Sequence, residues 1–207
     1  AQALMAEFDA QGVTDPRLIW INGSSKTAES AVFEKGAKDA ISDTTTIVKL
    51  GEMHGWKPEE GQQLVEAQIA SGGADSFDGV LVANDGGAGG VFAALNAAGI
   101  DPRTKPTTGQ DAELAGVQRI LAGQQFMTVY KPLQKLAEAS ATLACNLVKG
   151  EADAWPSDAD PTTVDNGTGE IPAMLIPPVA VTVDGKLEGT SSIADTVVAD
   201  LFYGADT

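Results

Sequence analysis

Two hydrophobic periods alternate along the chain. Short apolar runs rich in β-branched residues predict strands at residues 18–22, 45–50, 79–83, 107–109 and 126–130. Apolar residues at helical spacing predict helices at residues 2–11, 27–41, 58–70, 85–98, 112–122 and 132–148. Strands that alternate with helices of this length indicate βαβ units. We therefore expect an α/β fold, with a parallel sheet that is covered by helices on both faces.

Polar or aromatic residues stand at the ends of the expected strands. In an open parallel sheet, ligands bind outside the carboxyl ends of the strands. An amide can donate and accept hydrogen bonds, a carboxylate can accept from two neighbouring hydroxyls, and an indole offers a flat apolar face to a sugar ring. The pattern predicts one wall of a site for a small, neutral, hydroxyl-rich molecule, built from Trp56, Asn84, Asp85, Gln110, Asp111 and Lys131.

Each of these residues also has a purely structural interpretation. Asp85 and Asp111 stand where helix N-caps are expected, and an N-cap at this edge of the sheet would still lie beside the crevice. Trp56 precedes Pro58 at a strand-to-helix junction, where an indole can equally pack under the loop. From position alone, both interpretations of each residue stay open.

The remaining motifs do not indicate a catalytic centre. Residues 23–27, GSSKT, lack the G-x-x-x-x-G-K-[ST] spacing of a phosphate loop, and the glycines at 86–90 lack the spacing of a dinucleotide-binding turn. His54 is the sole histidine, and no His or Cys cluster has metal-ligand spacing. A glycosidase-like pair of Asp85 and Asp111 would lack a general acid in an apolar pocket. We expect no enzymatic activity, no cofactor and no metal.

Composition narrows the class of protein further. A net charge of −16 over 207 residues argues against a nucleic-acid partner, which would require clustered lysines and arginines. The single cysteine, Cys145, excludes an intrachain disulfide and is expected to be a small buried hydrophobe. No apolar run approaches the ~20 residues of a membrane span. No signal peptide is visible, and a secreted precursor would have lost one.

The character of the chain changes after residue 150. Residues 151–170 are acidic, contain prolines and glycines, and show almost no periodicity, so we expect an irregular surface segment. The strand-like run at 172–185 is broken by Pro177 and Pro178. A short amphipathic helix is expected at 193–203.

Three motifs in combination resemble a known family. They are VANDGGAGG at 82–90, GQDAELAG at 109–116 and MTVYKP at 127–132. With the sequence around them, they resemble the periplasmic sugar-binding proteins of bacterial ABC transporters, and most of all the xylose-binding and multiple-sugar-binding branch. The resemblance spans nearly the whole chain and is weakest over 152–169 and near the end.

The resemblance implies a type I binding protein, in which two α/β lobes close on a sugar. Residues 1–131 would be the carboxy-terminal sugar-binding lobe. Residues 132–170 would be a helix and an irregular segment that pack on an amino-terminal lobe missing from this chain. Residues 171–207 would be a returning crossing strand and the tail.

The resemblance also assigns sugar contacts, motif by motif. Trp56, from G-W-x-P-E, would stack on the sugar; Asn84 and Asp111 would bond its hydroxyls, and Lys131 would donate to it. The first loop departs from the pattern. The xylose branch typically reads G-S-P-x-D-N-N-A, whereas this chain reads G-S-S-K-T-A-E-S. Thr27 and Glu29 replace two expected sugar contacts, which weakens the case for xylose itself.

The function that this resemblance implies is solute capture. The protein would bind a monosaccharide, a xylose-like pentose or related aldose, and present it to the membrane permease of an ABC transporter. It would be periplasmic or extracellular, with or without a lipid anchor. The alternative is the effector domain of a sugar-responsive transcriptional regulator or kinase-linked sensor, which shares the fold. The upstream sequence would distinguish them, by a signal peptide or a helix-turn-helix.

Overall fold

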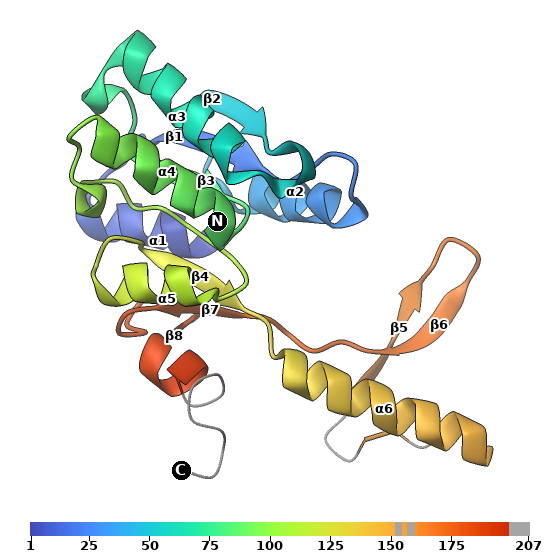
Figure 1. Ribbon diagram of the computed structural model, residues 1–207. Coiled ribbons are helices and arrows are strands. Elements are labelled where there is room, and N and C mark those ends of the chain that lie inside the picture. Colours follow the sequence, from blue (N-terminus) through green and yellow to red (C-terminus); the bar gives the residue numbers. More distant parts are fainter. Residues whose placement is uncertain (152–154, 157–159, 199–207) are drawn as a thin grey trace. The chain divides into compact units, whose positions relative to one another are not determined.

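The computed structural model describes residues 1–151, 155–156 and 160–198 of the chain. They form two compact units (Figure 1). Unit 1 comprises Ala1–Tyr130 and the described part of Val179–Thr207. Unit 2 comprises Lys131–Pro178.

Unit 1 is built on strands that pair in two groups. The first group is wholly parallel and has the order β2-β1-β3; the second has the order β4-β7-β8, in which β4 pairs antiparallel with β7 and β7 pairs parallel with β8. The strands are β1 (Arg17–Asn22), β2 (Thr46–Glu52), β3 (Gly79–Val82), β4 (Met127–Tyr130), β7 (Val179–Thr182) and β8 (Thr190–Ser192).

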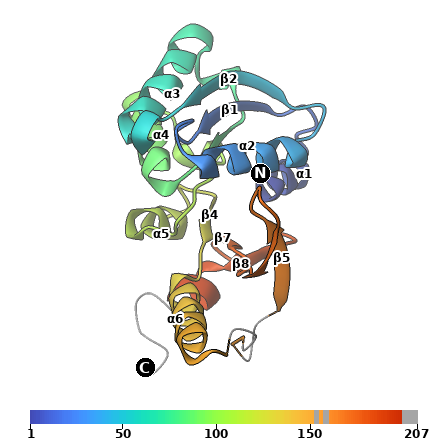
Figure 2. The same ribbon diagram turned by 90° about the vertical axis from the view of Figure 1, so that its right-hand side faces the viewer.

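Helices cover the β2-β1-β3 sheet on both faces, as the sequence predicts (Figure 2). The long helices of unit 1 are α1 (Gln2–Gln11), α2 (Ala28–Ala40), α3 (Pro58–Gly72), α4 (Asp85–Ala97) and α5 (Leu114–Leu121). Short turns of helix occur at η1 (His54–Trp56), η2 (Ala74–Ser76), η3 (Pro102–Thr104) and η4 (Ala194–Val198). The strand–helix alternation therefore gives the α/β architecture that was expected.

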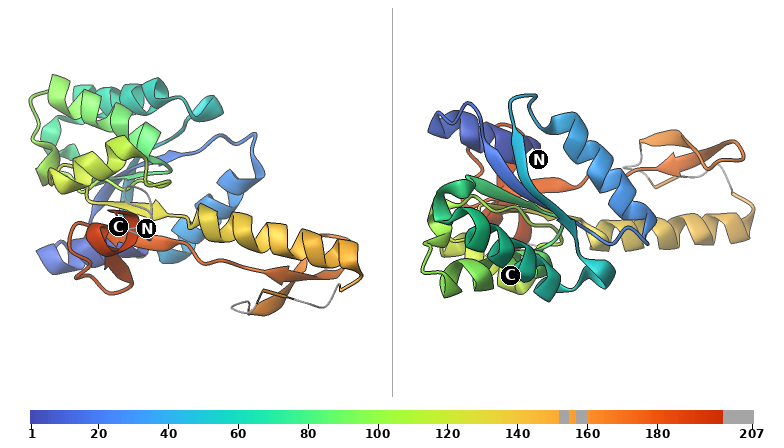
Figure 3. Two further views of the ribbon diagram at one scale, coloured as in Figure 1. Left: turned by 60° about the horizontal axis from the view of Figure 1, so that its bottom comes forward. Right: turned by 90° about the horizontal axis from the view of Figure 1, so that it is seen from above.

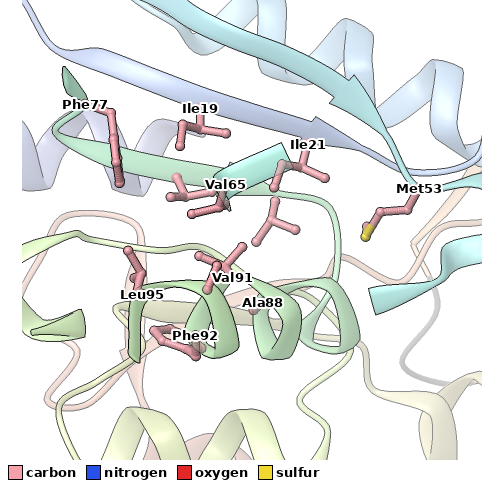
Figure 4. Close-up of a cluster of buried hydrophobic side chains, with 12 residues drawn as sticks. Ile19, Ile21, Met53, Val65, Phe77, Ala88, Val91, Phe92 and Leu95 are labelled. Carbon is pink, nitrogen blue, oxygen red and sulfur yellow. The ribbon is translucent and has the colours of Figure 1, made fainter. Parts of the chain in front are cut away.

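Alternate residues of the strands pack on opposite faces of this sheet. Ile19 and Ile21 of β1 join the larger core, which α3 and α4 complete (Figure 4). Leu18 and Trp20 point to the other face, where Leu4 and Phe8 of α1 cover them. This alternation is the period of two that a strand imposes, applied to a strand whose two faces are both buried.

Several boundaries differ from the sequence prediction. The strand expected at 107–109 is a single β-bridge between Thr107 and Val80. Asn84, not Asp85, is the N-cap of α4, because its Oδ1 accepts the Gly87 N–H at 2.8 Å. Asp111 caps no helix, since α5 begins three residues later with Glu113 at its N-cap.

Asp85 is instead a buried junction between four segments. Its side chain is 1% exposed. Oδ1 accepts a hydrogen bond from Gln125 Nε2 at 2.7 Å, and Oδ2 accepts from Thr128 Oγ1 and the Glu113 N–H, both at 2.9 Å. Arg119 donates to the Asp85 backbone carbonyl at 2.8 Å. One carboxylate therefore fixes the start of α4 against the start of α5 and against β4.

Two glycines leave the space that this carboxylate occupies. A Cβ at Gly109 would overlap Asp85 Oδ1, and a Cβ at Gly116 would overlap Oδ2. Glycine at both positions is therefore explained by close approach to Asp85 and not by a turn conformation. The first and last glycines of the GQDAELAG motif serve to seat the buried carboxylate.

Unit 2 contains α6 (Leu133–Lys149) and an antiparallel hairpin of β5 (Pro161–Asp165) and β6 (Glu170–Met174) (Figure 3). The hairpin corrects the prediction of a wholly irregular segment at 151–170; its strands show no alternation of apolar and polar residues, because most of these residues are exposed. Pro177 and Pro178 do interrupt the strand pattern, between β6 and β7. The end of the tail helix, 199–203, lies outside the described residues.

Much of the α6 surface is apolar and exposed. Leu133, Leu136 and Leu147 are 64%, 47% and 62% exposed, whereas Ala139 is the buried residue of this helix. Cys145 is also exposed, which corrects its assignment as a buried hydrophobe: it lies on a helix that buries little of itself. Apolar patches of this kind in soluble proteins mark surfaces that are covered by a partner.

The burial of Asp85 predicts a pH-dependent contribution to stability. Burial raises the pKa of this carboxyl to about 6, against the hydrogen bonds from Gln125, Thr128 and Glu113, which lower it. The folded state therefore holds this proton more tightly than the unfolded state, and the contribution of Asp85 to stability grows as pH falls from about 6 towards 3.8. We expect Asp85→Asn to destabilise the chain by about 1–3 kcal/mol at neutral pH, because an amide leaves a buried donor unmatched.

Urea unfolding at a series of pH values tests this prediction. The free-energy difference between wild type and Asp85→Asn should widen as pH falls from about 6. Asp101→Asn is the control, because a hydrogen bond from Arg103 lowers the pKa of Asp101. The free-energy difference between wild type and Asp101→Asn should therefore shrink as pH falls. If the free-energy difference from wild type changed in the same direction with pH in both variants, the raised pKa of Asp85 would be contradicted.

The exposed face of α6 predicts self-association of the 207-residue chain. We expect light scattering to show dimers or larger species, because burying these leucines against a second copy removes them from water. Leu136→Gln with Leu147→Gln should shift the chain to monomer. Leu114→Gln is the matched control, since Leu114 is an exposed leucine of α5, in unit 1. A monodisperse wild-type monomer with α6 folded would refute the prediction.

Candidate functional site

The carboxyl ends of the strands in unit 1 are tied together in a row by backbone hydrogen bonds. The Met53 N–H donates to Asn22 at 3.0 Å, and the Ala83 N–H donates to Ile21 at 3.1 Å. Further along the row, the Asp85 N–H donates to Gln110, and the Asp111 N–H donates to Val129, both at 2.9 Å. The segments that carry Trp56, Asn84 and Asp111 therefore leave the same edge of the sheet, as the topology predicts.

Trp56 is held at this edge in an unfavourable backbone conformation. Its φ is 61°, following Gly55 at 64°, and its N–H donates to the Met53 carbonyl at 3.0 Å. A bulky residue in the left-handed region is rare and costs about 1–3 kcal/mol. The six-membered part of the indole packs on Gly23, where a Cβ would overlap the ring. The indole is partly buried and packs against the larger core.

The loop after β1 lies against the same indole. Ser30 Oγ is next to the position that a Gly23 side chain would take, and it hydrogen-bonds Thr27 Oγ1 at 2.9 Å. Thr27 Oγ1 also donates to the Ser24 carbonyl at 3.0 Å. Thr27 is therefore part of the structure of the loop as well as a candidate ligand contact. Glu29, in the first turn of α2, is exposed.

Asn84 has one of its two polar groups engaged. Its Oδ1 accepts the Gly87 N–H as the N-cap of α4, while Nδ2 makes no hydrogen bond to any residue that the structure describes. A Cβ at Gly86 would lie 3.7 Å from Asn84 Nδ2 and 3.8 Å from Glu113 Oε1, so these two polar groups face one small residue. The cap therefore fixes the orientation of the Asn84 amide and occupies its oxygen.

Asp111 also stands in a strained segment. Its φ is 93° and that of Ala112 is 50°, two consecutive residues other than glycine in the left-handed region. The Ala112 N–H donates to Thr128 Oγ1 at 3.2 Å, which together with the Asp111 N–H bond ties this turn to β4. Asp111 itself is exposed. Strain of this kind concentrates at ligand sites, where the surrounding structure fixes it.

Lys131 directly follows β4 and is the first residue of unit 2. Its position relative to Trp56, Asn84 and Asp111 therefore stays a prediction. The sequence also placed Asp85 and Gln110 at the strand ends: Asp85 is the buried junction, and the backbone carbonyl of Gln110 accepts the Asp85 N–H.

Sequence reasoning missed a polar cluster beside Trp56. His54 Nε2 contacts Glu52 Oε1 at 2.6 Å, and His54 Nδ1 contacts Glu60 Oε2 at 2.9 Å. Glu52 also accepts from the Ser25 N–H and Ser25 Oγ, both at 3.1 Å. Glu60 could have been suspected from its place in the first turn after Pro58, where a carboxylate can reach back to preceding N–H groups. The pairing of His54 with Glu52 has no sequence signal.

A hollow of about 470 Å³ opens on the α2 side of the sheet. Its walls include Trp20, Phe33 and Met127, and also Asn22, Ala83 and Gln110 from the segments at the carboxyl ends of the strands. Trp56, Asn84 and Asp111 do not line it. The hollow therefore adjoins the row of strand-end segments through Asn22, Ala83 and Gln110, the last of which belongs to the wall predicted from the sequence.

Two further properties bear on the class of protein. Within the described residues, no helix is both long enough and apolar enough to cross a membrane. Over the same residues, no group of three or more His, Cys, Asp or Glu side chains is arranged to hold a metal ion.

The chain is similar to known proteins over most of its length. Residues 1–152 match the family model of the periplasmic binding protein domain. The D-xylose-binding periplasmic protein of Escherichia coli K12 is 34% identical over 188 residues, which cover 88% of this chain and 53% of that protein. The multiple sugar-binding periplasmic receptor ChvE of Rhizobium radiobacter is 31% identical over 130 residues, which cover 61% of this chain and 36% of that protein.

A solved structure agrees with these relatives. The ABC transporter solute binding protein of Clostridium phytofermentans with bound β-D-glucose matches with a TM-score of 0.75 and 25% identity, over 99% of this chain and 65% of that one. The chain spans about half the length of the xylose-binding relative. It belongs to the periplasmic binding protein domain family and has the fold of one lobe of a type I binding protein.

Proposed function

We propose that the chain is the carboxy-terminal lobe of a solute-binding protein that captures a monosaccharide for an ABC transporter. The observation that carries this proposal is the row of strained or capped residues at one sheet edge, Trp56, Asn84 and Asp111, in a chain 34% identical to a xylose-binding protein. A strained indole, an amide that is oriented to donate and an exposed carboxylate suit a neutral polyol, whose ring has both an apolar face and hydroxyls.

The contacts that each site residue makes within the protein indicate which kind of contact it would make with the sugar. The cap to Gly87 occupies Asn84 Oδ1, so Asn84 would donate to a sugar oxygen through Nδ2. Asp111 would accept from hydroxyls, and Trp56 would stack on the C–H face of the ring. Lys131 would donate a further hydrogen bond. Thr27, at the N-cap of α2, and Glu29, in the first turn of α2, would set which hydroxyl pattern is accepted.

The ligand class that we propose is a xylose-like pentose or a related aldose. The xylose-binding relative and the glucose-bound structure both favour an aldose. Glu29 brings a carboxylate to a place where the xylose branch typically has an amide, so a sugar with hydroxyls to donate there would be preferred over xylose. This difference makes a related aldose an explicit part of the proposal.

Binding would be used for lobe closure and not for chemistry. A second, amino-terminal lobe would complete the cleft, and the closed form would be recognised by a membrane permease. The site residues include no nucleophile paired with a base, since His54 engages two carboxylates at the surface. The periplasm is the compartment that the relatives' names favour for the mature protein.

Substitution of the strand-end residues tests the proposal in the full-length protein with both lobes. We expect Trp56→Ala and Asp111→Asn each to weaken aldose binding by about 10- to 100-fold in calorimetry, because each removes a buried contact worth about 1–3 kcal/mol. Trp56→Phe should lose less, because it retains an aromatic face. Asp101→Asn, which removes an exposed carboxylate paired locally with Arg103, is the matched control and should bind like wild type.

The 207-residue chain should bind the same sugar far more weakly than the full-length protein. One lobe supplies only part of the hydrogen bonds and cannot enclose the ligand, so we expect affinity to fall by several orders of magnitude. Titration of both proteins with a panel of aldoses measures the difference. Micromolar binding by the 207-residue chain would show that the proposed second lobe is not needed for the site.

A further inference from the structure

His54 bridges two carboxylates that come from different elements. Its ring Nε2 lies 2.6 Å from Glu52 Oε1, at the end of β2, and its ring Nδ1 lies 2.9 Å from Glu60 Oε2, in the first turn of α3. The backbone N–H of His54 donates to the same Glu60 oxygen at 2.5 Å. His54 is therefore fixed through its backbone and through both ring nitrogens.

The bridge continues into the loop after β1. Glu52 Oε2 accepts the Ser25 N–H, and Glu52 Oε1 accepts Ser25 Oγ, both at 3.1 Å. Ser25 is two residues from Gly23, on which the indole of Trp56 packs. The polar chain Ser25–Glu52–His54–Glu60 thus connects the loop beneath the indole to the helix that follows it.

The position of Trp56 depends on contacts with neighbouring residues, because its own backbone conformation is unfavourable. The turn His54–Trp56 places Gly55 and Trp56 at φ 64° and 61°. Such a turn persists only where neighbouring contacts fix it. The backbone bond from Trp56 to Met53 and the packing on Gly23 are two of these contacts, and the His54 bridge anchors the first residue of the turn.

We propose that His54 is a positioning residue for Trp56, and that the protonated ring of His54 holds the indole in its sugar-facing position. This inference deepens the proposed function and rests on it for the role of Trp56 in binding. No family motif quoted above contains His54, and the sole histidine of the chain stands two residues before the stacking tryptophan.

The protonation requirement follows from the two contacts. An imidazolium has an N–H on each nitrogen, so it donates to Glu52 and Glu60 together. A neutral ring has one N–H and one lone pair, and the lone pair would then face a carboxylate oxygen. Hydrogen bonds from the His54 backbone and ring lower the pKa of Glu60, and the charge of Lys57 lowers it further. Loss of the ring proton therefore breaks one side of the bridge.

The indole N–H resonance of Trp56 in a ¹H–¹⁵N spectrum of the 207-residue chain reports this coupling without any sugar. The chain has three tryptophans, and Trp56→Phe assigns the relevant peak. Histidine changes charge between about pH 5 and 8. We expect the Trp56 peak to move along a single titration over this range, while the buried Trp20 peak stays in place. In His54→Gln, the Trp56 peak should no longer move.

Glu59→Gln is the matched control. Glu59 precedes Glu60 in the same helical turn and carries the same charge, but it is exposed and has no contact with His54 in the described structure. In Glu59→Gln, the Trp56 peak should move with pH as it does in wild type. A stationary Trp56 peak in folded wild-type chain, or a peak that still titrates in His54→Gln, would overturn the proposal.

A second arm links the bridge to binding in the full-length protein. Aldose affinity should fall by roughly three- to tenfold as pH rises through the range in which the Trp56 peak moves, and His54→Gln should be weak throughout and insensitive to pH. If the peak titrates but the protein binds no aldose at any pH, the positioning by His54 stands and the proposed function fails. If aldose binds without this pH dependence, the proposed function stands and the coupling to His54 fails.

Discussion

The carboxylate of Asp85 is the constraint on which the site depends. It is buried, and three donors from separate segments converge on it: the Gln125 side chain, the Thr128 hydroxyl and the Glu113 N–H. The residue before it is the capped Asn84, and the residues before Glu113 are the strained pair that includes Asp111. A single buried acceptor therefore sets the relative placement of two candidate ligand contacts. Removing it would leave donors unmatched and both turns without a common anchor.

Backbone strain is distributed along the same edge. Three residues other than glycine have positive φ in the described chain, Trp56, Asp111 and Ala112, and all three lie at strand ends. A structure that stabilises such conformations must use other contacts to offset their cost, and here these are the His54 bridge, the Gly23 packing and the hydrogen bonds to β4. The strained residues therefore lie at the edge where the sugar contacts are proposed, which is where strain is expected to concentrate at a ligand site.

The sequence predicted the elements that depend on local pattern and failed where distant contacts decide. The helices and the parallel strands β1, β2 and β3 follow from apolar periodicity, which burial on two faces imposes. Asp85 was interpreted as a cap because its partners, 28 to 43 residues away, leave no local signal. Cys145 was placed in a core because its apolar helix was assumed to be covered. The hairpin β5–β6 was missed because its exposed residues do not alternate in polarity.

The polar contacts at the site also change what each side chain can offer a ligand. From its type alone, Asn84 could donate and accept; its cap to Gly87 leaves the amide nitrogen as the group that faces outward. From its type alone, His54 could exchange a proton or bind a ligand; its contacts with Glu52 and Glu60 engage both ring nitrogens within the protein. Both changes have the same cause. A polar atom that is already hydrogen-bonded within the protein is not available to a ligand, but its hydrogen bond orients a neighbouring group that can contact the ligand. Specificity in this lobe would therefore depend on the supporting hydrogen bonds as much as on the residues that touch the sugar.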